Sequence, residues 1–249
     1  MGAARLPGVD RYSERPVPAA AGDLLTCVWS RRTDGPSPDG SVVTRIVPDA
    51  CVDIFWHRQR GSLSVAGPDT RAHVMSLAAG ELVGVRFHTG RSPAALGVPA
   101  DALRDERLDL AQLWPHRTEQ LAEALAATGS VAEAQAVLAS VTRTAARAGP
   151  DPAVPELLRL ARDGLRVGAM ADAIGLTERQ LHRRCLAAFG YGAKTLQRVL
   201  RFDRAMRLAH GGARLADVAY RAGYADQAHL SREVRALAGV SPTQLLVAA

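Results

Sequence analysis

The period with which hydrophobic and polar residues alternate changes near residue 100, and this change divides the chain into two parts. Between residues 24 and 90, short runs rich in Val, Ile, Phe and Trp are separated by Gly, Pro, Asp and Ser, a pattern typical of β-strands joined by turns. Short strands with short connections predict a mostly antiparallel sheet or a small barrel. The expected strands are Leu24–Arg31, Ser41–Val47, Cys51–His57, Ser62–Ala66, Ala72–Leu77 and Leu82–His88.

From about Ala100 the apolar residues recur with the helical period of about 3.6 residues. Two helices are expected after Trp114, and the second begins with a capping box formed by Ser130 and Glu133. The run Gly149-Pro150-Asp151-Pro152 cannot continue a helix, so we place a domain boundary there. Nearly all of the chain after this boundary is predicted to be helical.

One sequence motif occurs twice in this last part, at Met170–Leu181 and at Val218–Leu230. Each copy has an Ala four residues before a Gly, an apolar residue directly after the Gly, and then an amphipathic helix that ends near a second Gly. A small Ala lets two helices approach closely, and Gly at a helix end adopts a positive φ without steric cost. Thr177 and Asp226 are expected to cap the helices that follow. The motif therefore predicts two helix-turn-helix units.

The second helix of each unit is expected to have one buried and one exposed face. Helical periodicity predicts these core residues: Leu181, Cys185, Ala188, Leu230, Val234 and Leu237. The other face is rich in Arg, His and Gln, whose hydrogen-bonding geometry suits base edges in the major groove of DNA. A solvated polar face is the alternative, and the repetition of the motif argues against it.

The charge distribution favours an anionic partner for the last hundred residues. The chain of 249 residues carries a net charge of +6. Residues 1–149 hold 16 basic and 16 acidic side chains, whereas residues 150–249 hold 15 basic and nine acidic ones. The whole excess of positive charge therefore accompanies the predicted helix-turn-helix units, as expected for a protein that binds a polyanion; a solvated basic face is the alternative.

Length and cysteine content exclude several classes of protein. A chain of this length can bury a core without disulfides, and its three cysteines, Cys27, Cys51 and Cys185, are far apart and form no C-x-x-C pair. Alone they build neither a structural zinc cluster nor a redox motif, and they fit a reducing cytoplasm. The sequence shows no secretion signal and no apolar run of about 18 residues, so we expect a cytoplasmic protein without membrane contact.

The second motif copy is followed by the run Ala238-Gly239-Val240-Ser241-Pro242. With this run, the tract from about Pro155 to Leu246 resembles the DNA-binding domain of the AraC/XylS family of bacterial transcription regulators. The resemblance implies a non-enzymatic transcription factor for double-stranded DNA, with two helix-turn-helix units joined by a rigid helix, here expected at Thr195–His210. It also implies RNA polymerase as a partner and favours a homodimer, and it implies no cofactor.

By position in the family motif, the resemblance implies two sets of DNA contacts. The residues expected to reach bases are Arg179, His182, Arg183, Gln227, His229 and Arg232. The residues expected to touch phosphates are Lys194, Arg198, Arg201 and Thr243. The sequence departs from the family in two ways: the usual Phe is replaced at Cys185, Leu230 and Val234, and the common Ser-Pro is replaced by Gly192-Ala193.

Four short runs precede the predicted linker: Val47–Trp56, Ala66–Pro68, Gly84–Phe87 and Leu96–Pro99. They resemble the uncharacterised β-rich N-terminal domain of one subgroup of AraC-type regulators. The expected fold class is therefore α+β. Its parts are a β-rich, barrel-like sensing or dimerisation domain at 1–115, a helical linker at 116–149, and an all-α domain at 150–249 with two helix-turn-helix units joined by a long helix.

The N-terminal domain is expected to bind a small organic effector. Its strands carry aromatic residues that can line a pocket, together with a few polar groups that can orient a ligand. The expected pocket residues are Cys51, Asp53, Phe55, His57, Arg86 and His88. A closed aromatic core is the alternative to a pocket, and a structural ion pair is the alternative role of Asp53 and Arg86.

Other functions are considered on the same residues. A metal-responsive regulator would use Cys51, Asp53, His57, His73 and His88, but these histidines lack the spacing of a metal-binding pair. A protein-interaction module is the alternative to DNA binding. An enzyme is not expected, because a DNA-repair sensor with an AraC-like domain needs four clustered cysteines, and the chain has neither a G-x-S-x-G motif nor a Gly-rich phosphate loop.

Overall fold

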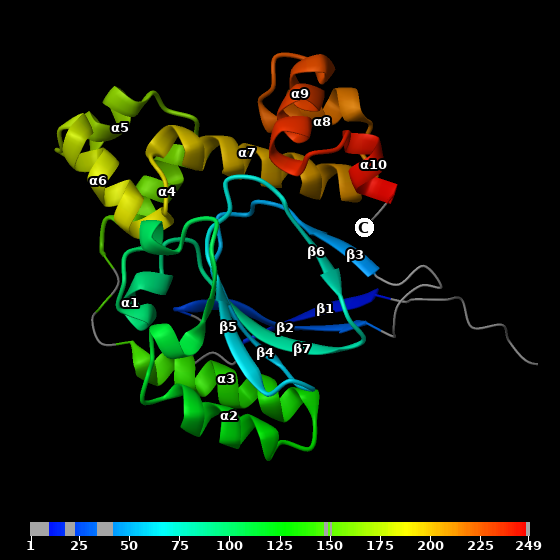
Figure 1. Ribbon diagram of the computed structural model, residues 1–249. Helices are drawn as coiled ribbons and strands as arrows, with labels where there is room; N and C mark the ends of the chain where they lie inside the picture. Colours follow the sequence, from blue (N-terminus) through cyan, green and yellow to red (C-terminus); the bar gives the residue numbers. More distant parts are fainter. Residues whose placement is uncertain (1–9, 18–22, 34–41, 147–148, 150, 248–249) are drawn as a thin grey trace, which may run out of the picture.

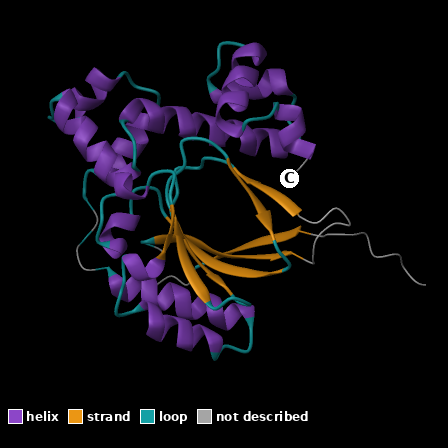
Figure 2. Ribbon diagram, in the orientation of Figure 1, coloured by secondary structure: helices purple, strands orange, loops and turns teal. Residues whose placement is uncertain are grey.

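The structure of the protein, a computed structural model, describes residues 10–17, 23–33, 42–146, 149 and 151–247. An N-terminal part rich in strands is followed by a C-terminal part made of helices (Figure 1 and Figure 2). The α+β class expected from the sequence is thereby confirmed. In the described ranges, no helix combines the length and the apolar character needed to cross a membrane.

A six-stranded antiparallel sheet with the strand order β1-β2-β7-β4-β5-β8 forms most of the N-terminal part. Its strands are β1 (Asp10–Pro16), β2 (Leu25–Thr33), β4 (Asp53–His57), β5 (Ser62–Ala66), β7 (Gly80–Phe87) and β8 (Arg107–Asp109). A separate two-stranded ribbon pairs β3 (Val42–Ile46) with β6 (His73–Leu77). All six strands expected from the sequence are present, and Ser41, the expected start of β3, lies outside the described residues.

The alternation in β4 shows why these segments form a sheet with one buried face. Ile54 and Trp56 are fully buried, whereas the residues between them point to the opposite face and are half-buried. Apolar side chains of α2 (Thr118–Ala126) and α3 (Val131–Ala145) complete the core on the buried side. Figure 1 shows both helices against the sheet. The helices expected as a linker therefore share their core with the N-terminal sheet.

The sequence pattern predicts neither β1 nor β8. β1 is an edge strand with the polar sequence DRYSERP that pairs with β2, so no buried face marks it in the sequence. The helical structure expected from Ala100 onward is wrong between Ala100 and Asp109. The structure has a short helix there, η2 (Ala100–Leu103), followed by the strand β8. Backbone pairing with β5 overrides the local period there. Two further short helices lie beside these elements, α1 (Ser92–Leu96) and η3 (Leu110–Gln112).

Helix α7 (Ala193–His210) connects two groups of helices in the C-terminal part (Figure 1). The core of the first group includes Leu181 and Leu196, and that of the second includes Phe202 and Leu230. Because Leu196 and Phe202 both belong to α7, this helix contributes to both cores, and the expected joining helix is confirmed. The other helices are α4 (Val154–Arg162), α5 (Val167–Ala173), α6 (Glu178–Phe189), α8 (Leu215–Ala222), α9 (Gln227–Ala238) and α10 (Pro242–Val247).

The N-terminal part contacts both groups of helices through the connection after β3. Val47 packs on the core of the second group, and Ala50 is buried in the core of the first. One short segment thus touches both helix-turn-helix units. The division of the chain into domains at residues 115 and 149 stays a prediction, and Pro150 at the expected boundary lies outside the described residues.

Candidate nucleic-acid interface and interdomain cavity

The first helix-turn-helix unit consists of α5, α6 and the turn between them. Gly175 has a φ of +66°, and the Leu176 N–H donates to Ala171 O at 2.9 Å, so the chain turns directly after α5. Thr177 caps α6, because its Oγ1 accepts from the Gln180 N–H at 3.3 Å and its own N–H donates to Gln180 Oε1 at 2.9 Å. This capping box confirms the expected start of the helix.

The second unit, α8 and α9, has the same geometry. Gly223 has a φ of +83°, and the Tyr224 N–H donates to Ala219 O at 2.8 Å. The cap is Asp226, whose Oδ1 accepts from the His229 N–H at 2.6 Å. The duplicated motif therefore folds into two helix-turn-helix units, as its sequence predicts.

Five of the six side chains expected to reach bases are exposed in the first halves of α6 and α9: Arg179, His182, Arg183, Gln227 and Arg232. The sixth, His229, is half-buried, since its Nδ1 accepts from the Ala225 N–H at 3.3 Å and its ring meets that of Tyr224 edge-on, 5.2 Å between centroids. A neutral ring that accepts at Nδ1 carries its proton on Nε2. His229 therefore offers a donor at Nε2.

The side chains expected to touch phosphates fall into two pairs. Lys194 and Thr243 are exposed. Arg198 and Arg201 of α7 are half-buried against the second unit: Arg198 Nε donates to Glu233 Oε2 at 2.7 Å, and the Arg201 guanidinium lies 4.8 Å from the ring centroid of Tyr224. Arg201 Nη2 is also 3.9 Å from the Glu233 carboxylate. These contacts tie the joining helix to α9.

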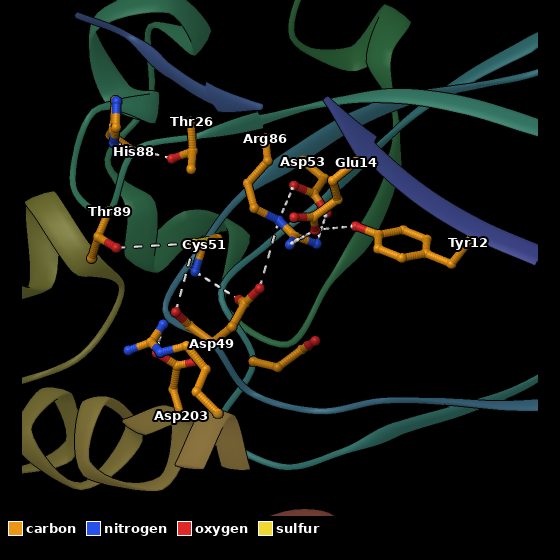
Figure 3. A network of polar contacts seen from close by, with 12 residues as sticks. Tyr12, Glu14, Thr26, Asp49, Cys51, Asp53, Arg86, His88, Thr89 and Asp203 are labelled. Carbon is orange, nitrogen blue, oxygen red and sulfur yellow. Dashed lines mark hydrogen bonds and ion pairs between the residues drawn. The ribbon is translucent and has the colours of Figure 1, made fainter. Parts of the chain in front are cut away.

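A network of charged groups surrounds Arg86 of β7 (Figure 3). Arg86 donates from Nε and Nη2 to the two carboxylate oxygens of Asp53, at 3.0 and 3.1 Å, and from Nη1 to Glu14 Oε1 at 3.0 Å. Asp49 Oδ2 lies 3.6 Å from Arg86 Nε. The ion pair between Asp53 and Arg86, considered from the sequence, is confirmed. It is part of a cluster in which three carboxylates face one guanidinium.

Burial and this excess of carboxylates shift the pKa values of the cluster. Burial raises the pKa of Asp53, although Arg86 opposes the shift. Burial lowers the pKa of Arg86, but the carboxylates of Asp53 and Asp49 outweigh it, so the net shift is upward. Burial, with Asp49 as the next contribution, raises the pKa of the Cys51 thiol well above its ordinary value. Burial also raises the pKa of Cys27 to about 11. Both thiols are therefore protonated at neutral pH.

A cavity of about 580 Å³ lies next to this cluster, between the N-terminal part and the helices α4 and α7. The N-terminal part contributes Glu14, Asp49, Cys51, Arg86, His88 and Thr89 to its wall, among others. The helices contribute Leu158, Arg162, Leu200, Asp203 and Arg207. Burial raises the pKa of Asp203, and Arg207, which pairs with it, opposes the shift. A ligand in this cavity would touch both parts of the molecule.

The structure brings together only some of the residues expected in an effector pocket. Cys51, Arg86 and His88 line the cavity. Asp53 is not in the wall, but it pairs with Arg86, which is. Phe55 and His57 do not line it; their rings contact each other, 5.4 Å between centroids. The sequence analysis did not find the wall residues from α4 and α7, because no local pattern links them to strands more than 60 residues away in the chain.

The geometry of the described residues offers no candidate metal site. In the part of the chain that the structure describes, no group of three or more His, Cys, Asp or Glu side chains could hold a metal ion. Burial, with the charge of Arg60 as the second cause, lowers the pKa of His57. His88 contacts Thr26 through Nδ1 at 3.1 Å.

Two capped helix-turn-helix units on one joining helix define a DNA-binding protein of the helix-turn-helix class. In agreement with this class, residues 170–247 match the family described as "Helix-turn-helix domain", and residues 18–109 match the family described as "Domain of unknown function (DUF6597)". The C-terminal region is an AraC-type helix-turn-helix domain, and the chain is a DNA-binding transcription regulator. No curated protein matches the chain.

Solved structures of ToxT from Vibrio cholerae are similar to the chain at low sequence identity. One ToxT structure has a TM-score of 0.47 at 13% identity and covers 84% of this chain and 96% of that one. ToxT bound to an unsaturated fatty acid gives 0.46 at 12% identity, with 82% and 93% covered. ToxT bound to (E)-4-(8-methylnaphthalen-1-yl)but-3-enoic acid gives 0.48 at 13% identity, with 84% and 98% covered.

Proposed function

We propose that the protein is a sequence-specific transcription regulator that reads DNA with α6 and α9 and responds to a small organic effector. The observation that carries the proposal is the duplicated helix-turn-helix, in which both second helices expose Arg, His or Gln in their first halves. These side chains have the hydrogen-bonding geometry that base edges in the major groove require. We propose that this regulator acts in the cytoplasm and that RNA polymerase is its partner. We also propose that it forms a homodimer, which light scattering of the intact protein tests.

The roles proposed for single residues follow their positions on α6, α7, α9 and α10. The base-reading residues are Arg179, His182, Arg183, Gln227, His229 and Arg232, and the phosphate contacts are Lys194, Arg198, Arg201 and Thr243. Because Glu233 accepts from Nε of Arg198, the terminal nitrogens of that guanidinium are the atoms we propose for a phosphate. Arginine contacts of this kind orient the protein on the duplex, whereas the base contacts select the sequence.

DNA binding is tested with the full chain. Duplexes selected by the protein from a random library serve as specific DNA, and a scrambled duplex serves as non-specific DNA. Several phosphate contacts require the logarithm of the binding constant to fall with the logarithm of salt concentration, by about 0.9 for each contact. Undetectable binding, or binding that does not depend on salt, would contradict the proposal.

The effector is proposed to bind in the cavity between the two parts. The cavity lies where a small molecule would contact Asp49 and Arg86 on one side and α7 on the other. Asp49 belongs to the connection after β3, in which Val47 and Ala50 pack on the two helix-turn-helix cores. A ligand that moves Asp49 therefore acts on both units at once.

The effector is tested by thermal melting of the intact protein with metabolites and with divalent metal ions. A ligand at 100 times its dissociation constant adds about 2.7 kcal/mol to the free energy of unfolding. For a chain of this size, that raises the melting temperature by roughly 5–10 °C. A response to metal ions alone would contradict an organic effector.

A further inference from the structure

The N-terminal part contacts the same place in both helix-turn-helix units, namely the end of the second helix. Arg45 of β3 donates from Nη1 to Ala238 O, the carbonyl of the last residue of α9, at 2.7 Å. Arg104, directly after η2, donates from Nη1 to Gly190 O, the carbonyl of the residue that ends α6, at 3.1 Å. One arginine of the N-terminal part thus reaches each DNA-reading helix.

A guanidinium suits the end of a helix for two physical reasons. The last carbonyls of a helix lack partners within the helix, so they need donors from elsewhere. The helix dipole also places partial negative charge at this end, which favours a cation there. Arg45 is half-buried and Arg104 is exposed, but the hydrogen bonds of both are partly buried and therefore less exposed to solvent than surface ion pairs.

Further contacts beside each arginine bring the helix end close to the N-terminal part. Next to Arg45, the Ala72 N–H donates to Leu237 O at 2.6 Å. At the end of α6, a Cβ on Gly190 would lie 2.4 Å from Cγ of Pro68, so only glycine leaves room for this contact. The helix ends are thus seated on the N-terminal part, and a change in either arginine acts at a tight junction.

Arg45 and Arg104 contact the C-terminal ends of α9 and α6, and not the N-terminal halves of these helices. The proposed base-reading residues lie in the first half of each helix and are largely exposed. The helix α7 packs in the cores of both units and so sets their separation and orientation from one side. The two arginine contacts add a second restraint, at the ends of α6 and α9.

We propose that Arg45 and Arg104 are positioning residues that hold α6 and α9 at one spacing and orientation on the N-terminal part. The full chain then recognises DNA in which the two halves of the site have one particular separation. This inference rests on the proposed DNA-reading role of α6 and α9. It concerns the free protein, and it requires no effector.

The experiment compares DNA sites that differ only in the separation of their halves. One inserted base pair moves the second half by about 3.4 Å along the duplex and about 35° around it. We expect the unchanged protein to lose about tenfold or more in affinity for the selected site when one or two base pairs are inserted. In the double variant Arg45→Met, Arg104→Met, which keeps the apolar stems but not the donors, we expect the loss to shrink to about threefold.

Two controls separate positioning from charge and from folding. The variant Arg45→Lys, Arg104→Lys keeps a cationic donor at both helix ends and should restore most of the spacing preference. Arg71→Ala removes an exposed positive charge from the same part of the chain and should leave the spacing profile unchanged. If the double Met variant does not fold, the single Met variants take its place, and each should relax the profile in part.

The outcomes distinguish the positioning role from the proposed function. Selected duplexes that bind no better than scrambled DNA would refute the DNA-reading role itself. If the unchanged protein shows the spacing preference and the Met variants retain it in full, the positioning role is refuted while DNA reading stands. A relaxed profile in the Met variants, with restoration by Lys, supports the positioning role.

Discussion

The base-reading role of α6 and α9 can be tested one residue at a time. We expect Arg183→Ala and Arg232→Ala each to relax the selection at one or two base pairs, because a bidentate contact between Arg and guanine contributes about 1–3 kcal/mol of discrimination. Arg201→Ala should instead weaken binding to all sequences alike, as expected for a phosphate contact. Competition between the selected duplex and single-base variants measures the difference.

Arg204 supplies the control for these substitutions, since it is an exposed arginine of α7 with no proposed base contact. Arg204→Ala removes the same charge and should change specific and non-specific binding by the same factor. If Arg183→Ala and Arg232→Ala behave like this control, then neither residue reads a base.

The charged cluster at the cavity predicts that Arg86 is needed for stability. Arg86→Met leaves the carboxylates of Asp53, Glu14 and Asp49 without their shared cation, in a site where Arg86 is mostly buried. Removing one partner of a buried ion pair costs about 3–5 kcal/mol. Arg58→Met, which removes one half of the more exposed pair with Glu81, should cost about 1 kcal/mol or less. Denaturant unfolding at neutral pH measures both.

The same variant has a predictable pH dependence. Burial raises the pKa of Asp53, and Arg86 opposes this shift, so without Arg86 the pKa rises further. A carboxyl group whose pKa is higher in the folded state than in the unfolded state binds protons more tightly when folded, so stability increases as pH falls through the folded pKa. Arg86→Met should therefore regain part of its lost stability between pH 7 and pH 5. A loss that stays constant over this range would contradict the assignment.

At the scale of elements, Glu233 determines how far α7 can contribute to DNA binding. Its carboxylate accepts from Arg198 and lies near Arg201, so both arginines are held against the second unit. We expect Glu233→Gln to weaken this hold and to let one or both guanidinium groups contact phosphate. The slope of log K against log salt should then become steeper by about 0.9 for each added contact.

Glu178→Gln is the matched control, because Glu178 is an exposed acidic residue in the first turn of α6. It removes one negative charge near the proposed interface without releasing an arginine pair. Both variants should bind DNA more tightly at low salt, since each loses a repulsive charge. If they also show the same slope, the contacts of Arg198 and Arg201 with Glu233 do not limit phosphate binding.

The elements that could be predicted are those whose cause lies in neighbouring residues. A run of β-branched and aromatic residues bounded by turn residues identified β4, and the Gly and cap residues of the duplicated motif identified both helix-turn-helix units. β1 could not be found, because its polar residues form an edge strand only through pairing with β2. β8 was hidden by a helical period that backbone pairing with β5 overrides.

The candidate sites divide in the same way. The exposed face of a helix follows from its own period, so the proposed base-reading residues could be listed from the sequence. The cavity depends on contact between strands and helices that are far apart in the chain, and no local pattern predicts Asp203 or Arg207 in its wall. Arg45 and Arg104 were missed for the same reason, since an arginine that reaches a distant carbonyl has no sequence signature.

At the scale of the whole molecule, the cavity and the DNA-reading helices form one linked system. Segment 45–51 carries Arg45 at the end of α9, Ala50 in the core of the first unit, and Asp49 and Cys51 in the cavity wall. Ala50 adopts a φ of +63°, a conformation that a residue with a Cβ adopts only when its surroundings hold it there. A ligand that moves Asp49 therefore shifts a constrained segment in contact with both units.

Linkage turns this arrangement into a quantitative prediction. An effector found by thermal melting should change DNA affinity by some factor, and DNA should change effector affinity by the same factor, because the coupling free energy is reciprocal. Couplings of about 1–3 kcal/mol correspond to factors of roughly 5 to 150. Titrations of each ligand with and without the other measure both factors. Leu158→Trp should fill part of the cavity and abolish the effector response, because Leu158 lies in the cavity wall on α4. It should leave DNA binding in place, because the proposed base-reading side chains belong to α6 and α9 and none of them lines the cavity. An effector that still binds and still changes DNA affinity in this variant would show that it acts from a different site.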